Sequence, residues 1–264
     1  MSVGKYEARA RSVNSLVCVG LDPQVSALPE RYRDEETPQF AWNRDVIDAT
    51  HQYVAAYKPN IAFYEERGVA GLHELRLTIK YLRERHPDIF SICDAKRADI
   101  GHTNEAYAAA IFDLMGFDAI TLHPYLGREA LAPFIERRDK VSLILCRTSN
   151  PGAGDLQDLK IEGRPLWQVV AEKVTNEWNA YGNLMMVVGA TYPGEMRRIR
   201  EVSGDLTFLV PGVGAQGGEV RAVVEAGLNS QGIGLIISSS RTIISAADPG
   251  EAARGLRDEI NRYR

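Results

Sequence analysis

The feature that most restricts the fold of this 264-residue chain is the regular alternation of short apolar runs with longer helical patterns. Many of the runs are apolar throughout, which is typical of parallel strands buried on both faces. The predicted strands are eight runs, 16–21, 57–63, 89–93, 118–122, 141–146, 184–188, 206–210 and 233–237. The predicted helices are clearest at 41–56, 71–86, 103–115, 166–181, 219–226 and 249–263.

Eight such strand–helix units predict the α/β class and a single-domain (β/α)8 TIM barrel. A doubly wound sheet is the alternative, although it would usually have fewer strands. α/β barrels of this length are routinely one domain, and no low-complexity linker interrupts the pattern. We therefore expect one barrel domain over residues 1–264.

Charge and hydropathy argue against two classes of partner. The net charge is −4 and no basic stretch stands out, so we expect no nucleic acid. No apolar run approaches the roughly 20 residues that span a bilayer, so we expect no membrane. The first residues are polar and contain no secretory apolar segment, which predicts a cytoplasmic protein. The three cysteines have no C-x-x-C spacing and are expected to be buried thiols.

One charged run follows the third predicted strand. Asp94, Lys96 and Asp99 come at its C-terminal end, and strand alternation points Asp94 and Lys96 the same way. Charge at this density beside a buried strand is costly unless the groups pair or do chemistry. The run therefore predicts a site built around a lysine held among carboxylates, at the end of the barrel where active sites gather.

Lys58, after the second predicted strand, adds a second cation to this group. Opposite charges within hydrogen-bonding distance keep the lysines protonated and the carboxylates ionised. A protonated Lys96 favours a proton donor over a nucleophile. Asp94 beside an anionic substrate group would raise that group's energy, and loss of neutral carbon dioxide would relieve it. The alternative is a purely structural ion-pair network.

The last two strand ends indicate a phosphate site. Glycines after run 206–210 let backbone N–H groups approach an anion, and Arg241 adds a bidentate donor where a helix begins. The alternative is a glycine-rich turn and a surface arginine. We expect no metal, because the five histidines are scattered and the lysines would compete with magnesium at Asp22, Asp94 and Asp99.

At these residues the chain resembles the orotidine 5′-monophosphate decarboxylase family. The Asp-x-Lys-x-x-Asp-Ile-x-x-Thr signature spans 94–103, and the segments Ser-Asn-Pro-Gly (149–152) and Pro-Gly-x-Gly-Ala-Gln-Gly-Gly (211–218) follow. A lone Asp-x-Lys-x-x-Asp is shared with a related barrel family. The ordered set, which follows six of the strands, covers essentially the whole chain.

The resemblance implies decarboxylation of orotidine 5′-monophosphate to uridine 5′-monophosphate without a metal or cofactor. It implies that Lys96 protonates the C6 carbanion, that Asp94 lies against the substrate carboxylate and that Lys58 contacts Asp94 and the ribose. Asp99, Ile100 and Thr103 would reach across from the second subunit of a homodimer with shared active sites. The remaining implied contacts are Asp22 to a ribose hydroxyl, Ser149 to the pyrimidine edge with Pro151 and Pro211 beside it, and Gln216, Ser240 and Arg241 to the 5′-phosphate.

Two other functions stay open on the sequence. Magnesium-dependent decarboxylases and aldolases of sugar phosphates share Asp94, Lys96 and Asp99 but carry a metal-binding glutamate in place of Lys58. A non-catalytic nucleotide-binding dimer is the second alternative, although it would have no reason to keep the four charged residues. Lys58 therefore discriminates between the enzymes, and it favours the metal-free reaction.

Overall fold

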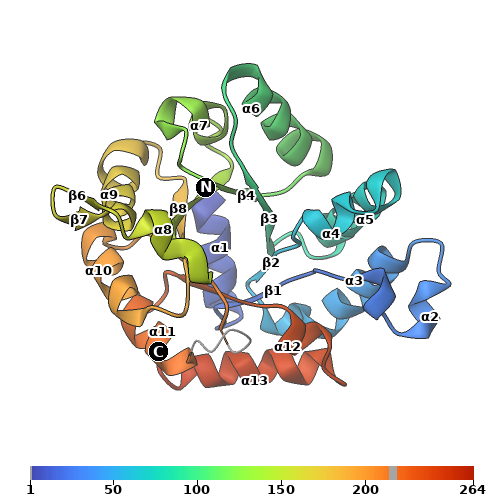
Figure 1. Cartoon of the computed structure of the whole chain (residues 1–264). Coiled ribbons are helices and arrows are strands. Elements are labelled where there is room, and N and C mark those ends of the chain that lie inside the picture. The colour runs from blue at the N-terminus through green and yellow to red at the C-terminus, as the bar shows by residue number, and fades with distance from the viewer. Residues whose placement is uncertain (1, 214–218) are drawn as a thin grey trace.

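The chain folds into a closed barrel of parallel strands with helices around the outside (Figure 1). This computed structural model describes residues 2–213 and 219–264. Within that part of the chain, neighbouring strands follow the order β1-β10-β9-β8-β5-β4-β3-β2, so the last strand pairs with the first. The strands are β1 (Val17–Val19), β2 (Ala56–Tyr57), β3 (Phe90–Arg97), β4 (Ala119–Leu122), β5 (Val141–Arg147), β8 (Leu184–Val188), β9 (Phe208–Pro211) and β10 (Leu235–Ser239). The predicted (β/α)8 barrel is confirmed.

The helices form the outer ring and the connecting loops. They are α1 (Ser2–Ser12), α2 (Glu30–Arg33), α3 (Pro38–Thr50), α4 (Ala62–Glu65), α5 (Gly68–Arg85), α6 (Gly101–Ala108), α7 (Gly127–Ile135), α8 (Gly154–Gln157), α9 (Leu166–Lys173), α10 (Pro193–Ser203), α11 (Val220–Gly227), α12 (Arg241–Ile244) and α13 (Pro249–Asn261). Short 3-10 turns are η1 (Val25–Ala27), η2 (His51–Tyr53) and η4 (Pro151–Ala153). π-helical turns η3 (Ala109–Met115) and η5 (Val174–Trp178) continue α6 and α9, and β6 (Lys160–Ile161) pairs with β7 (Arg164–Pro165) as a separate hairpin.

The predicted strand over 57–63 is largely wrong. β2 ends at Tyr57, and the chain is already helical from Ala62. Pro59 has no N–H to continue a ladder, and the Asn60 side chain accepts a hydrogen bond from the Ala62 N–H. The apolar residues after Lys58 therefore begin a helix, and Lys58 itself stands at the strand end.

Helix α1 was not predicted, and it covers the N-terminal end of the barrel (Figure 1). Its polar side chains bind groups at the starts of the strands: Tyr6 donates to the Leu235 carbonyl, and Lys5 pairs with Asp118 at 2.8 Å. Arg9 donates to the Val54 carbonyl at 3.2 Å. The opposite end, where the strands finish, stays open to ligands.

The core of the barrel and of the helix–sheet layers is mainly apolar. Cys18, Cys93 and Cys146 are free thiols buried in strands, as predicted. Burial raises the pKa of Cys18 and of Cys146 to about 12, so both stay protonated. In the described part of the chain, every helix is too short or too polar to cross a bilayer.

Candidate active site

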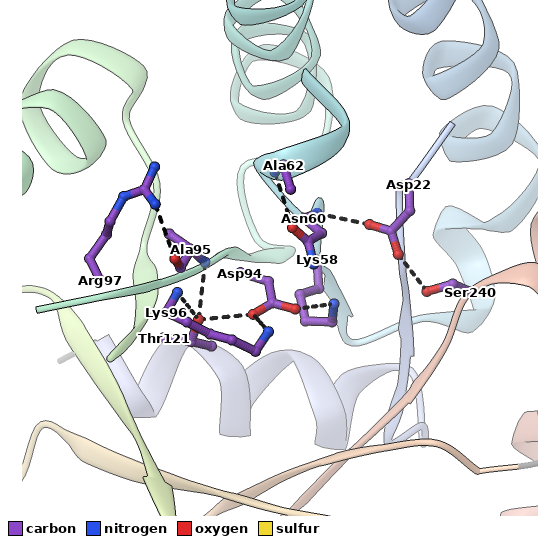
Figure 2. A network of polar contacts seen from close by, with 10 residues as sticks. All are labelled: Asp22, Lys58, Asn60, Ala62, Asp94, Ala95, Lys96, Arg97, Thr121 and Ser240. Carbon is purple, nitrogen blue, oxygen red and sulfur yellow. Dashed lines mark hydrogen bonds and ion pairs between the residues drawn. The ribbon is translucent and has the colours of Figure 1, made fainter. Parts of the chain in front are cut away.

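Asp94 lies at the centre of a buried cluster at the C-terminal end of β3 (Figure 2). Its Oδ2 accepts a hydrogen bond from Lys58 Nζ at 3.0 Å, and its Oδ1 accepts one from Lys96 Nζ at 2.6 Å. Lys58 follows β2, so two neighbouring strands supply the three charges. The sequence predicted a lysine among carboxylates. The structure shows the reverse, because one carboxylate is held between two ammonium groups.

Electrostatics fix the charge of this cluster. Burial alone would raise the pKa of Asp94, but Lys58 and then Lys96 outweigh burial and hold it well below its usual range. Burial alone would lower the pKa of Lys58, but Asp94 and Asp22 raise it above that of a free lysine. The cluster therefore carries two ammonium groups against one carboxylate at neutral pH, which suits it to an anionic ligand.

Lys96 lies in an irregular part of β3. Its backbone is left-handed, with φ of +45°, and the pairing of β3 with β4 shifts register between Cys93 and Arg97. The left-handed region costs a non-glycine residue about 1–3 kcal/mol. The bulge directs the ammonium group back to Asp94, while half of the Lys96 side chain stays exposed (51%). Strand alternation predicted the neighbourhood of Asp94 and Lys96 but not this bulge.

Thr121, at the end of β4, supports the bulge. Its Oγ1 accepts hydrogen bonds from the N–H groups of Ala95 (3.0 Å) and Lys96 (2.9 Å), and donates to Asp94 Oδ1 at 2.9 Å. One hydroxyl thus fixes both the strained backbone and the carboxylate (Figure 2). Thr121 was not among the predicted site residues, and its position at the end of a strand was the available signal.

Asp22 and Ser240 join the two ends of the chain across the barrel seam, the line where the first strand, β1, pairs with the last, β10. Ser240 Oγ donates to Asp22 Oδ2 at 2.9 Å, and the Asn60 N–H donates to Asp22 Oδ1 at 2.8 Å (Figure 2). A side chain at Gly20 would collide with Ser240, since its Cβ would lie 1.7 Å from Oγ. The carboxylate is therefore held at the mouth of the barrel, beside β1 and β10.

A cleft of about 510 Å³ opens at this seam. Asp22, Lys58, Pro211, Ser240 and Arg241 line it, together with apolar residues of the loop after β1 and of α3. Arg241 is exposed at the start of α12. Since Lys58 also binds Asp94, the cleft leads directly to the charged cluster.

Three predicted residues lie away from this cluster within the chain. Asp99 Oδ1 accepts a hydrogen bond from the Ile100 N–H at 2.7 Å, whereas in the described part of the chain the Lys96 ammonium pairs with Asp94 and not with Asp99, so the expected second carboxylate does not flank the lysine. Asn104 fixes this turn by accepting from the Asp99 N–H at 2.8 Å. Ile100 is 62% exposed, and Thr103 is exposed on the first turn of α6.

The residues predicted to contact the base and the phosphate are only partly described. Ser149 is half-buried after β5 and packs on Gly189, whose Cβ would lie 2.9 Å from Ser149 N. Pro151 is exposed at the start of η4. Gln216 lies outside the described residues. Among the residues that the structure describes, no three His, Cys, Asp or Glu side chains gather as metal ligands.

Comparison with known proteins gives one consistent family. A model described as "Orotidine 5′-phosphate decarboxylase / HUMPS family" matches residues 15–256. Orotidine 5′-phosphate decarboxylase of Cellvibrio japonicus (strain Ueda107) is 48% identical over 259 residues, covering 95% of this chain and 94% of that one. The solved OMP decarboxylase of Leishmania donovani is 39% identical, with a TM-score of 0.89 over 99% of this chain and 98% of the other. The UMP synthase of the same organism is 42% identical, with a TM-score of 0.90 over 98% of this chain and 55% of that one.

Proposed function

The chain belongs to the orotidine 5′-phosphate decarboxylase / HUMPS family, and we propose that it converts orotidine 5′-monophosphate into uridine 5′-monophosphate and carbon dioxide. The observation that carries this proposal is the Asp94 carboxylate held between Lys58 and Lys96 at the end of the barrel. The cleft beside it has a carboxylate for sugar hydroxyls and an arginine for a phosphate.

The substrate lies across the seam of the barrel. Arg241 and Ser240 bind the 5′-phosphate, with Gln216 as a further contact, and Asp22 accepts a hydrogen bond from a ribose hydroxyl. Lys58 donates to the ribose while it stays paired with Asp94. Ser149 donates to and accepts from the pyrimidine edge, with Pro151 and Pro211 beside the ring. This orientation brings C6 and its carboxylate to Asp94 and Lys96.

Decarboxylation is then a heterolytic step completed by proton transfer. The bond from C6 to the carboxylate breaks, its electron pair stays on C6, and carbon dioxide leaves as a neutral molecule. The ionised Asp94 beside the substrate carboxylate raises the ground-state energy, and departure of carbon dioxide relieves it. Lys96⁺ stabilises the developing carbanion and delivers a proton from Nζ to C6. Its exposed side chain regains a proton from solvent.

The reaction needs no metal or organic cofactor in this proposal. Both carboxylate oxygens of Asp94 already accept from ammonium groups, so a divalent cation would have to displace a lysine. Lys58 occupies the place where the sugar-phosphate enzymes of the family carry a metal-binding glutamate. A large share of the barrier reduction comes from binding energy at the remote phosphate, which holds the substrate against Asp94.

A homodimer completes the site. Among the described residues, Lys96 pairs with Asp94 and not with Asp99 of the same subunit, and Ile100 exposes an apolar side chain next to Asp99. In a two-fold dimer, the partner's copies of Asp99, Ile100 and Thr103 enter the site of the first subunit.

The test is conversion of orotidine 5′-monophosphate by the purified protein in excess EDTA, followed by near-ultraviolet absorbance. Rapid formation of uridine 5′-monophosphate supports the proposal. Inactivity in EDTA together with magnesium-dependent activity on a sugar-phosphate acid would assign the chain to the other branch of the family. Binding of uridine 5′-monophosphate without turnover under either condition would leave a nucleotide-binding protein.

A further inference from the structure

Arg147, the last residue of β5, is a buried cation that the decarboxylation chemistry leaves unused. It is 3% exposed, and its Nε donates to Glu195 Oε2 at 2.5 Å. Its guanidinium lies 4.4 Å from the centre of the Tyr192 ring and 3.4 Å from Asp158. Tyr192 and Glu195 belong to the turn into α10, which follows β8. Arg147 thus joins two strand-end loops on one side of the site.

The same guanidinium extends into the loop that carries Ser149. Arg147 Nη1 donates to Gln157 Oε1 at 3.3 Å, and that oxygen also accepts from the Thr148 N–H at 2.9 Å. Gln157 Nε2 returns a hydrogen bond to Thr148 Oγ1 at 2.8 Å, and Thr148 donates to Asn150 Oδ1 at 2.6 Å. Thr148 and Asn150, the residues on both sides of Ser149, are therefore linked to Arg147 through Gln157.

The backbone beneath Ser149 is fixed from the β8 side. The Gly189 N–H donates to the Arg147 carbonyl at 2.8 Å, and Gly189 has no Cβ, which lets Ser149 pack directly on it. Ala190 continues the chain of contacts by donating to the Pro211 carbonyl at 3.2 Å. The end of β8 thus links the loop that carries Ser149 to Pro211, one of the residues that line the cleft beside Asp22 and Arg241.

We propose that Arg147 is a positioning residue that sets Ser149 against the pyrimidine ring, and that Glu195 and Tyr192 hold it in place. The inference rests on the proposed function, since it concerns recognition of the base. Stability alone is a weak reason for this arrangement, because burying a guanidinium costs desolvation that its ion pairs seldom exceed. A rigid loop contributes more to ligand binding than to stability, since a hydrogen-bonding group that is misplaced by about 1 Å loses a large part of its effect.

The test separates binding of the base from binding of the rest of the nucleotide. Uridine 5′-monophosphate and ribose 5-phosphate share the phosphate and the sugar, so they differ in the ring that Ser149 reads. In Arg147→Met we expect the Kd for uridine 5′-monophosphate to rise about 10- to 100-fold. The inhibition constant for ribose 5-phosphate should stay within about twofold. The KM for orotidine 5′-monophosphate should rise with Kd, and Arg147→Lys should recover only part of the loss, because lysine lacks the planar fork.

Arg137→Met is the matched control. Arg137 also pairs with a carboxylate, Asp113 at 2.6 Å, and lies 5.8 Å from an aromatic ring, that of Phe112, but it lies in the turn between α7 and β5, at the opposite end of β5 from Arg147. This variant should bind both ligands like the wild type. Glu195→Gln keeps the guanidinium and weakens its anchor, so it reports on the network even where Arg147→Met fails to fold.

The two hypotheses fail differently. A wild-type protein that does not decarboxylate orotidine 5′-monophosphate in EDTA contradicts the proposed function. The wild type can instead be active while the Arg147 and Glu195 variants lose affinity equally for both ligands. That result shows a merely structural role and overturns the inference. Unchanged binding of both ligands in those variants overturns it as well.

Discussion

Lys96 donates a 2.6 Å hydrogen bond to Asp94, two residues earlier in the same strand, from a left-handed backbone with φ of +45°. A regular strand would not need that conformation, and the Thr121 hydroxyl that accepts from the Lys96 N–H holds it in place. The strain is thus located at the residue to which we assign proton transfer. Strained residues cluster at functional sites because the surrounding structure fixes their geometry.

Replacing Lys96 by alanine should nearly abolish turnover. The variant loses both the proton donor and the charge that stabilises the carbanion, so we expect kcat to fall at least ~10³-fold. Affinity for uridine 5′-monophosphate should stay largely intact, as measured by calorimetry. Lys80→Ala, on the exposed face of α5, is the control and should keep wild-type kinetics. Comparable turnover in Lys96→Ala would remove the assignment.

Asp94→Asn should destabilise the protein because it leaves Lys58 buried without its closest carboxylate. Breaking a buried pair in this way costs about 3–5 kcal/mol at neutral pH. This loss of unfolding free energy should shrink as pH rises toward the ordinary lysine pKa of about 10.4, because an uncharged Lys58 amine tolerates burial. Urea unfolding at pH 7 and pH 9.5 measures both values. Asp113→Asn, in the exposed pair with Arg137, should cost less than about 1 kcal/mol, and a similar cost for both variants would contradict the prediction.

Arg241→Ala should selectively weaken the binding of phosphorylated ligands. A charge-assisted hydrogen bond is worth roughly 1.5–3 kcal/mol, so affinity for uridine 5′-monophosphate should fall about 10- to 100-fold. Uridine, which lacks the phosphate, should bind the variant and the wild type equally. Parallel losses for nucleotide and nucleoside would show that Arg241 acts on the fold of the cleft instead of on the phosphate.

Mixing two inactive variants should restore activity if the sites are shared between subunits. Lys96→Ala and Asp99→Ala each damage every site of their own homodimers. A mixed dimer contains one site with an intact Lys96 and an intact partner Asp99, so random exchange should return about a quarter of wild-type activity. The measurement is turnover before and after unfolding and refolding the variants together. Activity equal to the sum of the separate samples would place Asp99 outside the partner's site.

The stacked pair of His51 and His86 should make stability depend on pH. Their ring centres are 4.3 Å apart, and burial, followed by His51, lowers the pKa of His86. The unfolded chain therefore binds a proton at His86 more readily than the folded chain does. The contribution of the neutral His86 to folding stability is thus present above the unfolded pKa of about 6.5 and is lost as pH falls. His86→Gln should reduce the drop in Tm between pH 7.5 and pH 5.5. An unchanged or larger drop would contradict the assignment.

The sequence predicts those parts of the molecule that depend on local pattern. The eight strands are found in chain order because buried parallel strands leave continuous apolar runs, and Lys58, Asp94 and Lys96 meet because parallel strand ends share one rim. Asp22 also lies at this rim. These residues could be predicted without knowing any distance.

The remaining parts depend on tertiary contacts that no local pattern contains. The Lys96 bulge exists because of Thr121 on the next strand, and Arg147 acquires its partners from the turn after β8. Helix α1 is mostly polar, and polar contacts to the strand starts hold it together with the buried side chains of Tyr6 and Ala10. Asp99 binds its own turn, and only the proposed dimer would bring its partner-subunit copy beside Lys96.

The hydrogen bond from Ser240 to Asp22 joins residues 218 positions apart. On a ribosome that adds about 5–20 residues per second, the Asp22 segment waits roughly ten to forty seconds for its partner to be synthesised. A nascent chain therefore carries Asp94 and Lys96 well before Ser240 and Arg241 have been synthesised. The cleft at this junction therefore takes shape only when the last strand, β10, has emerged and paired with β1.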